Sequence, residues 1–189
     1  MLDRLFQNWV YGGFLAGLAL LLLLPVLGEN WTALETLTFA IWPLYMLHQF
    51  EEHDGDRFRL FLNRNMFEGR EALSRADVFW INFAGVWLFM VGVLWAVHRG
   101  GAGWAMLASW LVLINGLAHI AQAAAMRQPN PGLVTAILIF IPSGAWLAWL
   151  AWPLASATQL ILSFLVVIAL HAAIIYRVKV NVRVRNDRR

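Results

Sequence analysis

Long apolar runs separated by short polar segments make up most of the chain. A helix needs about 20 mostly apolar residues to cross the hydrocarbon layer of a bilayer. Six runs reach that length, and we predict transmembrane helices over residues 9–27, 32–50, 78–98, 103–126, 133–151 and 155–176. The pattern therefore predicts an all-α, polytopic membrane helix bundle that forms a single transmembrane domain, residues 1–189.

Two polar segments stand outside this pattern. Residues 53–76 mix arginine with aromatic side chains, which is typical of a segment that lies at the membrane surface. The chain ends in a basic tail, residues 177–189. No small-residue cleavage site follows the first apolar run, so we expect that run to be a span rather than a signal peptide.

Composition supports a membrane protein. The chain is 61% hydrophobic and 13% charged, whereas soluble domains are about 45–50% apolar and about 25% charged. Cysteine is absent, which excludes a disulfide framework and a thiolate metal site. The net charge of +3 comes from basic residues that flank the spans. Anionic lipid headgroups explain these residues, and we expect no nucleic-acid partner.

The basic residues also predict an orientation. Of the 14 lysine and arginine residues, all except Arg99 fall on one side of the six-span arrangement. Cytoplasmic segments of membrane proteins carry the excess of lysine and arginine. We therefore predict that both termini, and the segment 53–76 with them, are cytoplasmic.

The second predicted span ends in a cluster of ionisable residues. His48, Glu51 and Glu52 are spaced i, i+3 and i+4, which places them on one face of a helix. A charged group in the bilayer centre costs about 2.5–3.5 kcal/mol on insertion scales. Residues of this kind are therefore candidates for a functional site.

Other predicted spans carry polar residues at a similar depth. Asn115 and His119 share one face of the fourth span, His171 lies near the inner end of the sixth, and Asn82 lies one turn into the third. At about 1.5 Å per residue, His119 is roughly 10 Å and His171 roughly 8 Å from the cytoplasmic ends of their helices. We expect these side chains to meet the cluster on the second span.

Imidazole and carboxylate groups are ligands of zinc and iron in proteins. The pattern assigns no role to His53 or Asn82. We predict a site for one or two zinc or iron ions with the ligands His48, Glu51, Glu52, His119 and His171. We predict catalytic roles for Glu51, Glu52 and Asn115. Asn115 would act by hydrogen bonding to a metal ligand rather than to the metal.

The segment 45–53, Tyr-Met-Leu-His-Gln-Phe-Glu-Glu-His, resembles the signature of the HXXEE family of bacterial integral membrane proteins. That family pairs the motif with Asn-x-x-x-His, matched by Asn115 and His119, and with a Pro-Gly segment followed by Thr-Ala, matched within residues 129–136. Pro129 stands where the family has tyrosine. The family has no settled activity, so the resemblance implies a bacterial cytoplasmic (inner) membrane location and a site, but no reaction.

Three classes of function fit these observations, and we favour the first. It is a metal-dependent enzyme, a hydrolase with zinc or an oxidase with iron, acting on a membrane lipid or hydrophobic small molecule from the cytoplasmic leaflet.

The second is a metal-free acid–base enzyme, an isomerase or an intramembrane protease, in which Glu51 and Glu52 influence each other. The protease pattern Glu-Glu-x-x-x-Arg fails because residue 56 is Asp.

The third is a metal or proton transporter or a subunit of a membrane complex, and a homo-oligomer is also left open. The outer halves of the last four spans carry few polar residues, which argues against a polar path through the membrane.

Overall fold

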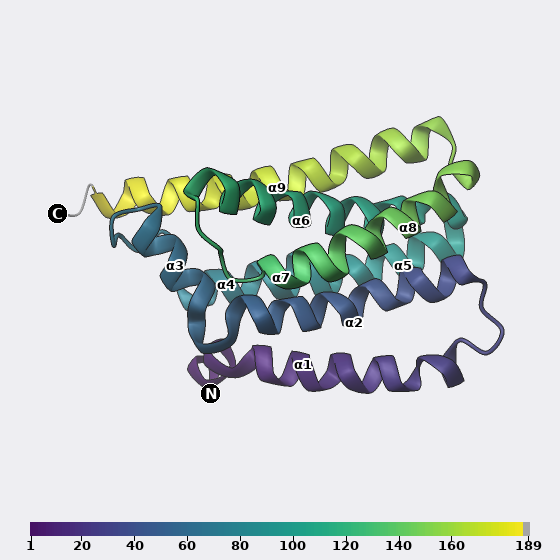
Figure 1. Cartoon of the computed structure of the whole chain (residues 1–189), viewed down its shortest axis with the longest axis horizontal. Coiled ribbons are helices and arrows are strands. Elements are labelled where there is room, and N and C mark those ends of the chain that lie inside the picture. The colour runs from purple at the N-terminus through teal and green to yellow at the C-terminus, as the bar shows by residue number, and fades with distance from the viewer. Residues whose placement is uncertain (187–189) are drawn as a thin grey trace.

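The computed structural model describes residues 1–186, with side chains to residue 184. Within this range the chain is helical, without strands. Six long helical rods lie side by side, and both termini are at the same end of the bundle (Figure 1). We call this the terminal end.

Residues 1–186 form fourteen helical elements. Their bounds are α1 (Leu2–Leu27), α2 (Ala33–His53), η1 (Asp54–Asp56), α3 (Arg57–Asn65), α4 (Arg75–Asn82), η2 (Phe83–Leu88), α5 (Phe89–Gly100), η3 (Ala102–Ala105), α6 (Met106–Met126), α7 (Leu133–Thr135), η4 (Ala136–Phe140), α8 (Ile141–Ala151), η5 (Trp152–Leu154) and α9 (Ala157–Asn186). α4, η2 and α5 form one rod, and α7, η4 and α8 form another.

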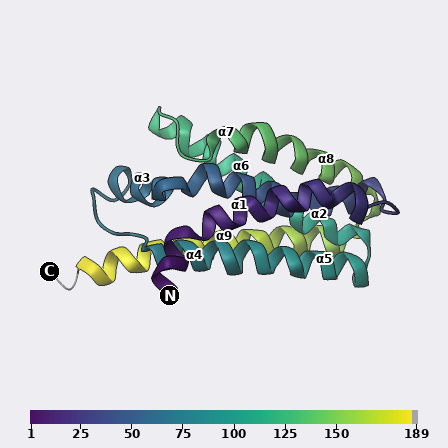
Figure 2. The same ribbon diagram turned by 90° about the horizontal axis from the view of Figure 1, so that it is seen from below.

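The outermost rods are longer than the apolar runs that predict them. α1 already begins at Leu2, and α9 continues as a helix through the basic tail to Asn186. Figure 2 shows that end of α9 extending past α4. The polar ends remain helical because a helix makes its backbone hydrogen bonds internally, whether lipid or water surrounds it. Residues 187–189 of the predicted tail lie outside the described residues.

Five rods are long and apolar enough to cross a membrane: Leu2–Leu27, Arg75–Gly100, Ala102–Met126, Leu133–Leu154 and Ala157–Val184. Their outward side chains are large and apolar, as at Leu22, Leu138 and Trp149, each more than two-thirds exposed. This is the surface of a membrane protein, since a lipid-facing surface needs no polar cover.

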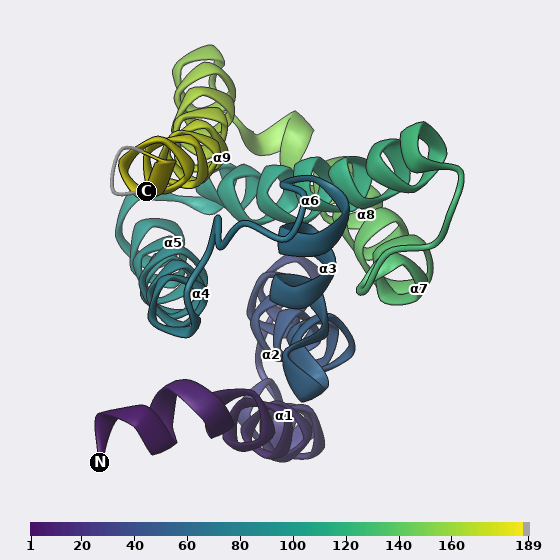
Figure 3. The same cartoon turned by 90° about the vertical axis from the view of Figure 1, so that its left-hand side faces the viewer.

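The sixth rod, α2, is not apolar enough to be counted with these five, and it carries the ionisable cluster. α2 packs against α1, α6 and α8, and from the terminal end it lies between α1 and α6 (Figure 3). Most of its side chains from Leu34 to His53 are buried or half-buried. A helix enclosed by protein can hold polar groups that a lipid-facing helix cannot, which explains why the cluster sits on α2.

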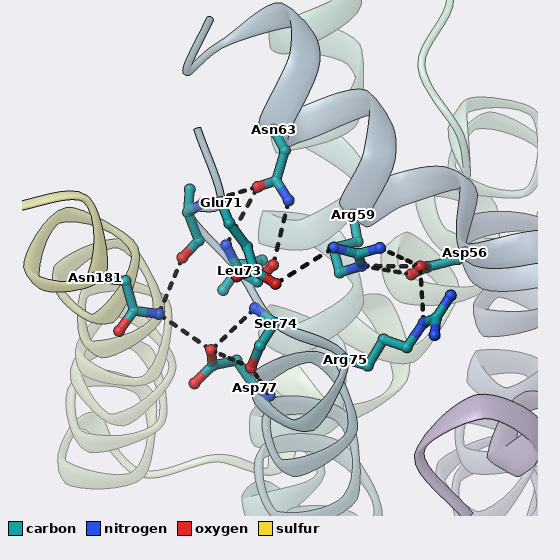
Figure 4. A network of polar contacts seen from close by, with 10 residues as sticks. Asp56, Arg59, Asn63, Glu71, Leu73, Ser74, Arg75, Asp77 and Asn181 are labelled. Atoms are coloured by element: carbon teal, nitrogen blue, oxygen red, sulfur yellow. Dashed lines mark hydrogen bonds and ion pairs between the residues drawn. The ribbon is translucent and has the colours of Figure 1, made fainter. Parts of the chain in front are cut away.

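The segment that follows α2 folds over the terminal end. Asn63 accepts hydrogen bonds from the backbone of Ala72 (2.9 Å) and Leu73 (3.2 Å), and Arg59 donates to Asp56 (2.6–2.9 Å). Figure 4 shows these contacts continuing through Arg75 to α4 and through Asn181 to α9. They fix α3 in place above the bundle.

Asp56 is the centre of one part of this network. Burial alone would raise the pKa of its carboxyl, but the hydrogen bonds and charges of Arg59 and Arg75 outweigh burial and hold the pKa below its ordinary value. A carboxyl with a lowered folded-state pKa contributes stability above its unfolded pKa, and that contribution is lost as pH falls through the folded value.

An Asp56→Asn variant tests this contribution. The backbone of Asp56 is left-handed (φ 65°), which asparagine tolerates, so the change removes mainly the charge. We expect the variant to melt below the wild type at pH 7. The difference should shrink as the pH falls below about 4. Melting followed by tryptophan fluorescence checks this, and a difference that stays constant from pH 7 to pH 3 would contradict it.

Candidate functional site

Two helices bring three buried ligand groups together at one point. His48 and Glu52 lie one turn apart on α2, and His119 comes from α6. Nε2 of His48 is 3.5 Å from Oε2 of Glu52, and Nε2 of His119 is 3.6 Å from Oε1 of the same carboxylate. One ligand atom from each residue lies within 4.8 Å of the other two. The i, i+4 spacing on α2 brings His48 and Glu52 together, and α6 adds His119.

The hydrogen bonds of His48 fix which of its nitrogens carries the hydrogen. Its Nδ1 is 2.7 Å from the hydroxyl of Thr135, and that hydroxyl donates to Glu51. Because a carboxylate only accepts, the hydroxyl has used its hydrogen and must accept from Nδ1–H. Nε2 of His48 therefore carries a lone pair, and this buried atom has no hydrogen-bond partner among the described residues.

His119 is oriented in the same way. The amide of Asn130 donates to the backbone oxygen of His119 (2.9 Å) and to Gln122 (2.6 Å). Its Oδ1 must therefore face Nδ1 of His119, 3.2 Å away, and accept from it. Nε2 of His119 presents its lone pair towards Glu52.

With both imidazoles neutral, two lone pairs and a carboxylate thus converge, with no hydrogen between them. Such a set of acceptors is repulsive unless a cation lies among them. The distances of 3.5 and 3.6 Å run to different oxygens of Glu52, so each imidazole faces its own carboxylate oxygen. Across the described residues, no lysine or arginine is paired with Glu51 or Glu52. The three residues fit a divalent metal ion.

The turn before α7 closes over the two imidazoles. Gly132 has a positive φ of 92°, a conformation that favours glycine. A Cβ atom at this position would lie 2.8 Å from Cε1 of both His48 and His119. Only a residue without a side chain fits there, and its close approach holds both rings in their orientation.

A comparison with protein-family models matches residues 39–147 to a family described as proteins of unknown function with an HXXEE motif. The chain belongs to the HXXEE family. This confirms the resemblance seen in the sequence, and the matched region contains every residue of the three-ligand group. No curated protein and no solved structure matches the chain.

The remaining predicted residues of this HXXEE protein lie around the three-ligand group. Glu51 turns to α7 and accepts from the backbone N–H groups of Val134 (3.2 Å) and Thr135 (2.7 Å). His171 bonds its own helix through Nδ1 and the oxygen of Val167, 2.9 Å apart. Neither Glu51 nor His171 is in the three-ligand group, whose members are His48, Glu52 and His119.

His53, to which the sequence assigns no role, is held against Glu52. Its Nε2 is 3.1 Å from Oε2 of Glu52 and 3.1 Å from the amide nitrogen of Asn82. Asn82 in turn accepts from Gln49 (2.9 Å), and Gln49 accepts from the indole of Trp87 (2.8 Å). This chain of hydrogen bonds ties His53, and with it the side chain next to the Glu52 carboxylate, to the α4–α5 rod.

Two π-helical turns begin directly after residues of this site. η2 starts after Asn82, and η4 starts after Thr135. A π turn inserts an extra residue into a helix and rotates the side chains beyond it, and such turns are frequent at functional sites. The local geometry of both rods is thus adapted at the positions that contact α2.

Sequence reasoning missed Asn130, Gly132 and Thr135 as parts of the site. They lie in the segment 129–136 that carried part of the resemblance, so a signal was present. Their roles depend on the path of the turn between α6 and α7, which residue spacing does not reveal.

A cavity of about 420 Å³ opens beside the three-ligand group. Its walls are mainly apolar side chains from α3, α4, α6 and α9. The polar side chains in its wall are Tyr45, Glu52, His53, Asn82, Asn115, His119, Gln122, His171 and Lys179. A mainly apolar cavity with a few polar groups is typical of a small-molecule site.

Proposed function

We propose that this HXXEE protein is a membrane-embedded metal-dependent enzyme that acts on an apolar molecule in the cavity. His48, Glu52 and His119 hold one divalent ion. The observation that carries the proposal is the convergence of two imidazole lone pairs on one buried carboxylate.

The proposal includes a topology. We infer that all six rods cross the membrane, α2 inside the bundle, and that the terminal end faces the cytoplasm of a bacterial cell. Both termini lie at that end, and the basic residues gather there by the positive-inside rule. The site would then lie in the cytoplasmic leaflet.

Zinc suits this donor set best. Two histidines and one glutamate leave a fourth position open, as in catalytic zinc sites. Zinc held here would supply Lewis-acid activation of water, which leads to hydrolysis of a lipid or other hydrophobic substrate. Iron in the same site would instead support oxidation.

Residues of the chain orient the metal ligands and supply the negative charge of the site. Glu52 contributes the negative charge that faces the ion, and His53 lies against Oε2 of that carboxylate, 3.1 Å away. Glu51 acts through Thr135 on His48, so we infer a positioning role for it rather than direct catalysis. The cavity keeps bulk water away from the apolar part of the substrate.

The metal-free alternative is less well supported. Glu51 and Glu52 face different partners, Thr135 and the histidines respectively. They therefore do not share one proton as a catalytic dyad would.

A lipid-conversion assay tests the proposed function. Protein purified without chelators would be reconstituted with a total bacterial lipid extract, and products would be followed by mass spectrometry. We expect zinc-dependent products that have gained the elements of water in the wild type and none in a His48→Ala/His119→Ala variant. Products that gain an oxygen atom would indicate iron chemistry. Conversion by the double variant at the wild-type rate would overturn the proposal.

Thr135→Val isolates the contribution of the positioning hydroxyl. Valine keeps the shape but removes the acceptor of His48 Nδ1–H, which sets the tautomer of the ring. Loss of such an outer hydrogen bond typically lowers metal affinity by about 10–100-fold. Zinc competition with a chromophoric chelator measures this loss. Ser143→Ala is the control, because that hydroxyl bonds only the backbone of its own helix at Ile139; an equal loss there, or none in Thr135→Val, would contradict the expectation.

A further inference from the structure

The cavity beside the three-ligand group opens sideways between two rods of the bundle. α6 and α9 diverge towards the terminal end (Figure 3). Three apolar residues of the cavity wall are exposed in this region: Ala118 on α6, Ile175 on α9 and Met66 after α3. Both rods are long and apolar enough to cross a membrane, so an opening between them faces lipid. A molecule dissolved in the membrane can enter there without passing through water.

The wall of this cavity changes from apolar to polar along its length. Gln122 and Lys179 lie at its terminal end, whereas Leu111 and Val86 form part of its deep end. Leu111 precedes Gln122 by eleven residues on α6, about 16 Å along the helix. A phospholipid has the same polarity, with its headgroup at the membrane surface and its chains in the hydrocarbon layer. The cavity therefore matches the orientation of a lipid in the leaflet at the terminal end.

Lys179 lies closer to the terminal end than the three-ligand group does. Arg177, two residues before Lys179, donates to Asp77 near the start of α4 (2.9 Å). Asn82, which contacts His53 beside the group, is five residues further along α4, about 8 Å deeper. A molecule with its headgroup at Lys179 and its hydrocarbon at the deep end therefore passes the three-ligand group.

The charge at the mouth of the cavity selects the headgroup. Lys179 is exposed and has no carboxylate partner among the described residues, and the same holds for Arg183, one turn further along the same face of α9. Five arginines of the terminal end do pair with carboxylates: Arg57, Arg59, Arg70, Arg75 and Arg177. Because like charges one turn apart repel each other, Lys179 and Arg183 together favour an anion.

We propose that the substrate is an anionic phospholipid, whose headgroup pairs with Lys179 and Arg183 and whose acyl chain lies in the apolar part of the cavity. This inference names the substrate class of the proposed enzyme and rests on that function for the reaction, but the binding step needs no metal. The lipid enters sideways between α6 and α9. Lys179 sets the headgroup specificity, and the apolar wall takes the chain.

Two phospholipids with identical acyl chains test the headgroup directly. Phosphatidylglycerol has a net negative charge, whereas the charges of phosphatidylcholine cancel. With chelator-treated protein in detergent, native mass spectrometry measures the affinity for each lipid. We expect phosphatidylglycerol to bind at least about fivefold more tightly. Lys179→Gln should lower the affinity for phosphatidylglycerol about fivefold and leave that for phosphatidylcholine nearly unchanged.

Arg4→Gln is the matched control for the loss of a cation. Arg4 is exposed and unpaired among the described residues, lies on α1 at the terminal end and is not in the cavity wall. This variant should keep the full preference for phosphatidylglycerol. Equal affinities of the wild type for the two lipids would overturn the inference, and so would a Lys179→Gln variant that keeps the preference.

Ala118→Trp tests the sideways opening. An indole at this position narrows the mouth, so both lipids should bind about tenfold more weakly. Leu117→Trp is its control, because Leu117 is 57% exposed but lies outside the cavity wall. Wild-type affinities in Ala118→Trp would contradict binding through this opening. Failure of the proposed function would look different: no metal bound, with the preference for phosphatidylglycerol intact.

Discussion

Replacing Glu52 by glutamine is expected to lower the affinity of the protein for zinc by more than about 100-fold, because changes behind the ligands alone cost up to that amount. Glu52 is the carboxylate that both imidazoles face, at 3.5 and 3.6 Å. Glutamine has the same shape, but it supplies no negative charge to the site. Isothermal titration of metal-free protein with zinc in detergent measures the change.

Glu35→Gln is the matched control for this substitution. Glu35 lies on the same helix, α2, but at its other end, where it caps the helix through Thr32. Its loss should weaken the cap without affecting zinc binding. Stoichiometric, tight zinc binding by the Glu52→Gln variant would contradict the assignment of Glu52 as a ligand.

Gly132→Ala is expected to have the second-largest effect, on both metal binding and stability. The positive φ of 92° alone costs a non-glycine residue about 1–2 kcal/mol. The added methyl group would also lie 2.8 Å from the rings of His48 and His119, so at least one ring must move. We expect a lower melting temperature and a loss of zinc affinity of at least about tenfold.

Gly101→Ala separates these two causes. Gly101 also has a positive φ, 97°, but a Cβ atom there meets nothing within 4 Å. This variant should lose stability from backbone strain and keep its zinc affinity. If the two variants bind zinc equally well, the close approach of Gly132 to the imidazoles is not what orients them.

Much of the architecture can be predicted from the sequence because the bilayer imposes simple rules. The length of an apolar run sets the length of a helix, so each of the six runs coincides with a rod of the bundle. The spacing of His48 and Glu52 places them one turn apart, and counting along α6 brings His119 to the same depth. These three form the group that the structure assembles.

The rest of the site depends on helix rotation, which depth does not reveal. His171 lines the same cavity, yet its Nδ1 faces the oxygen of Val167 on its own helix and it is not in the group. α9 is apolar on all sides, so its sequence does not show which face turns inward. Glu51 and Glu52 are neighbours separated by about 100° around α2. That Glu51 bonds Thr135 depends on where the chain places α7, which the sequence does not reveal.

The metal content of the wild-type protein tests the three-ligand site most directly. Protein purified in detergent without chelators, with zinc and iron supplied during growth, would be analysed by elemental mass spectrometry and X-ray absorption. We expect one metal ion per chain with two imidazole ligands at about 2.0–2.1 Å, and none in a His48→Ala/Glu52→Gln/His119→Ala variant. A wild type that is metal-free and takes up neither ion, or a triple variant with full occupancy, would contradict the proposed metal site.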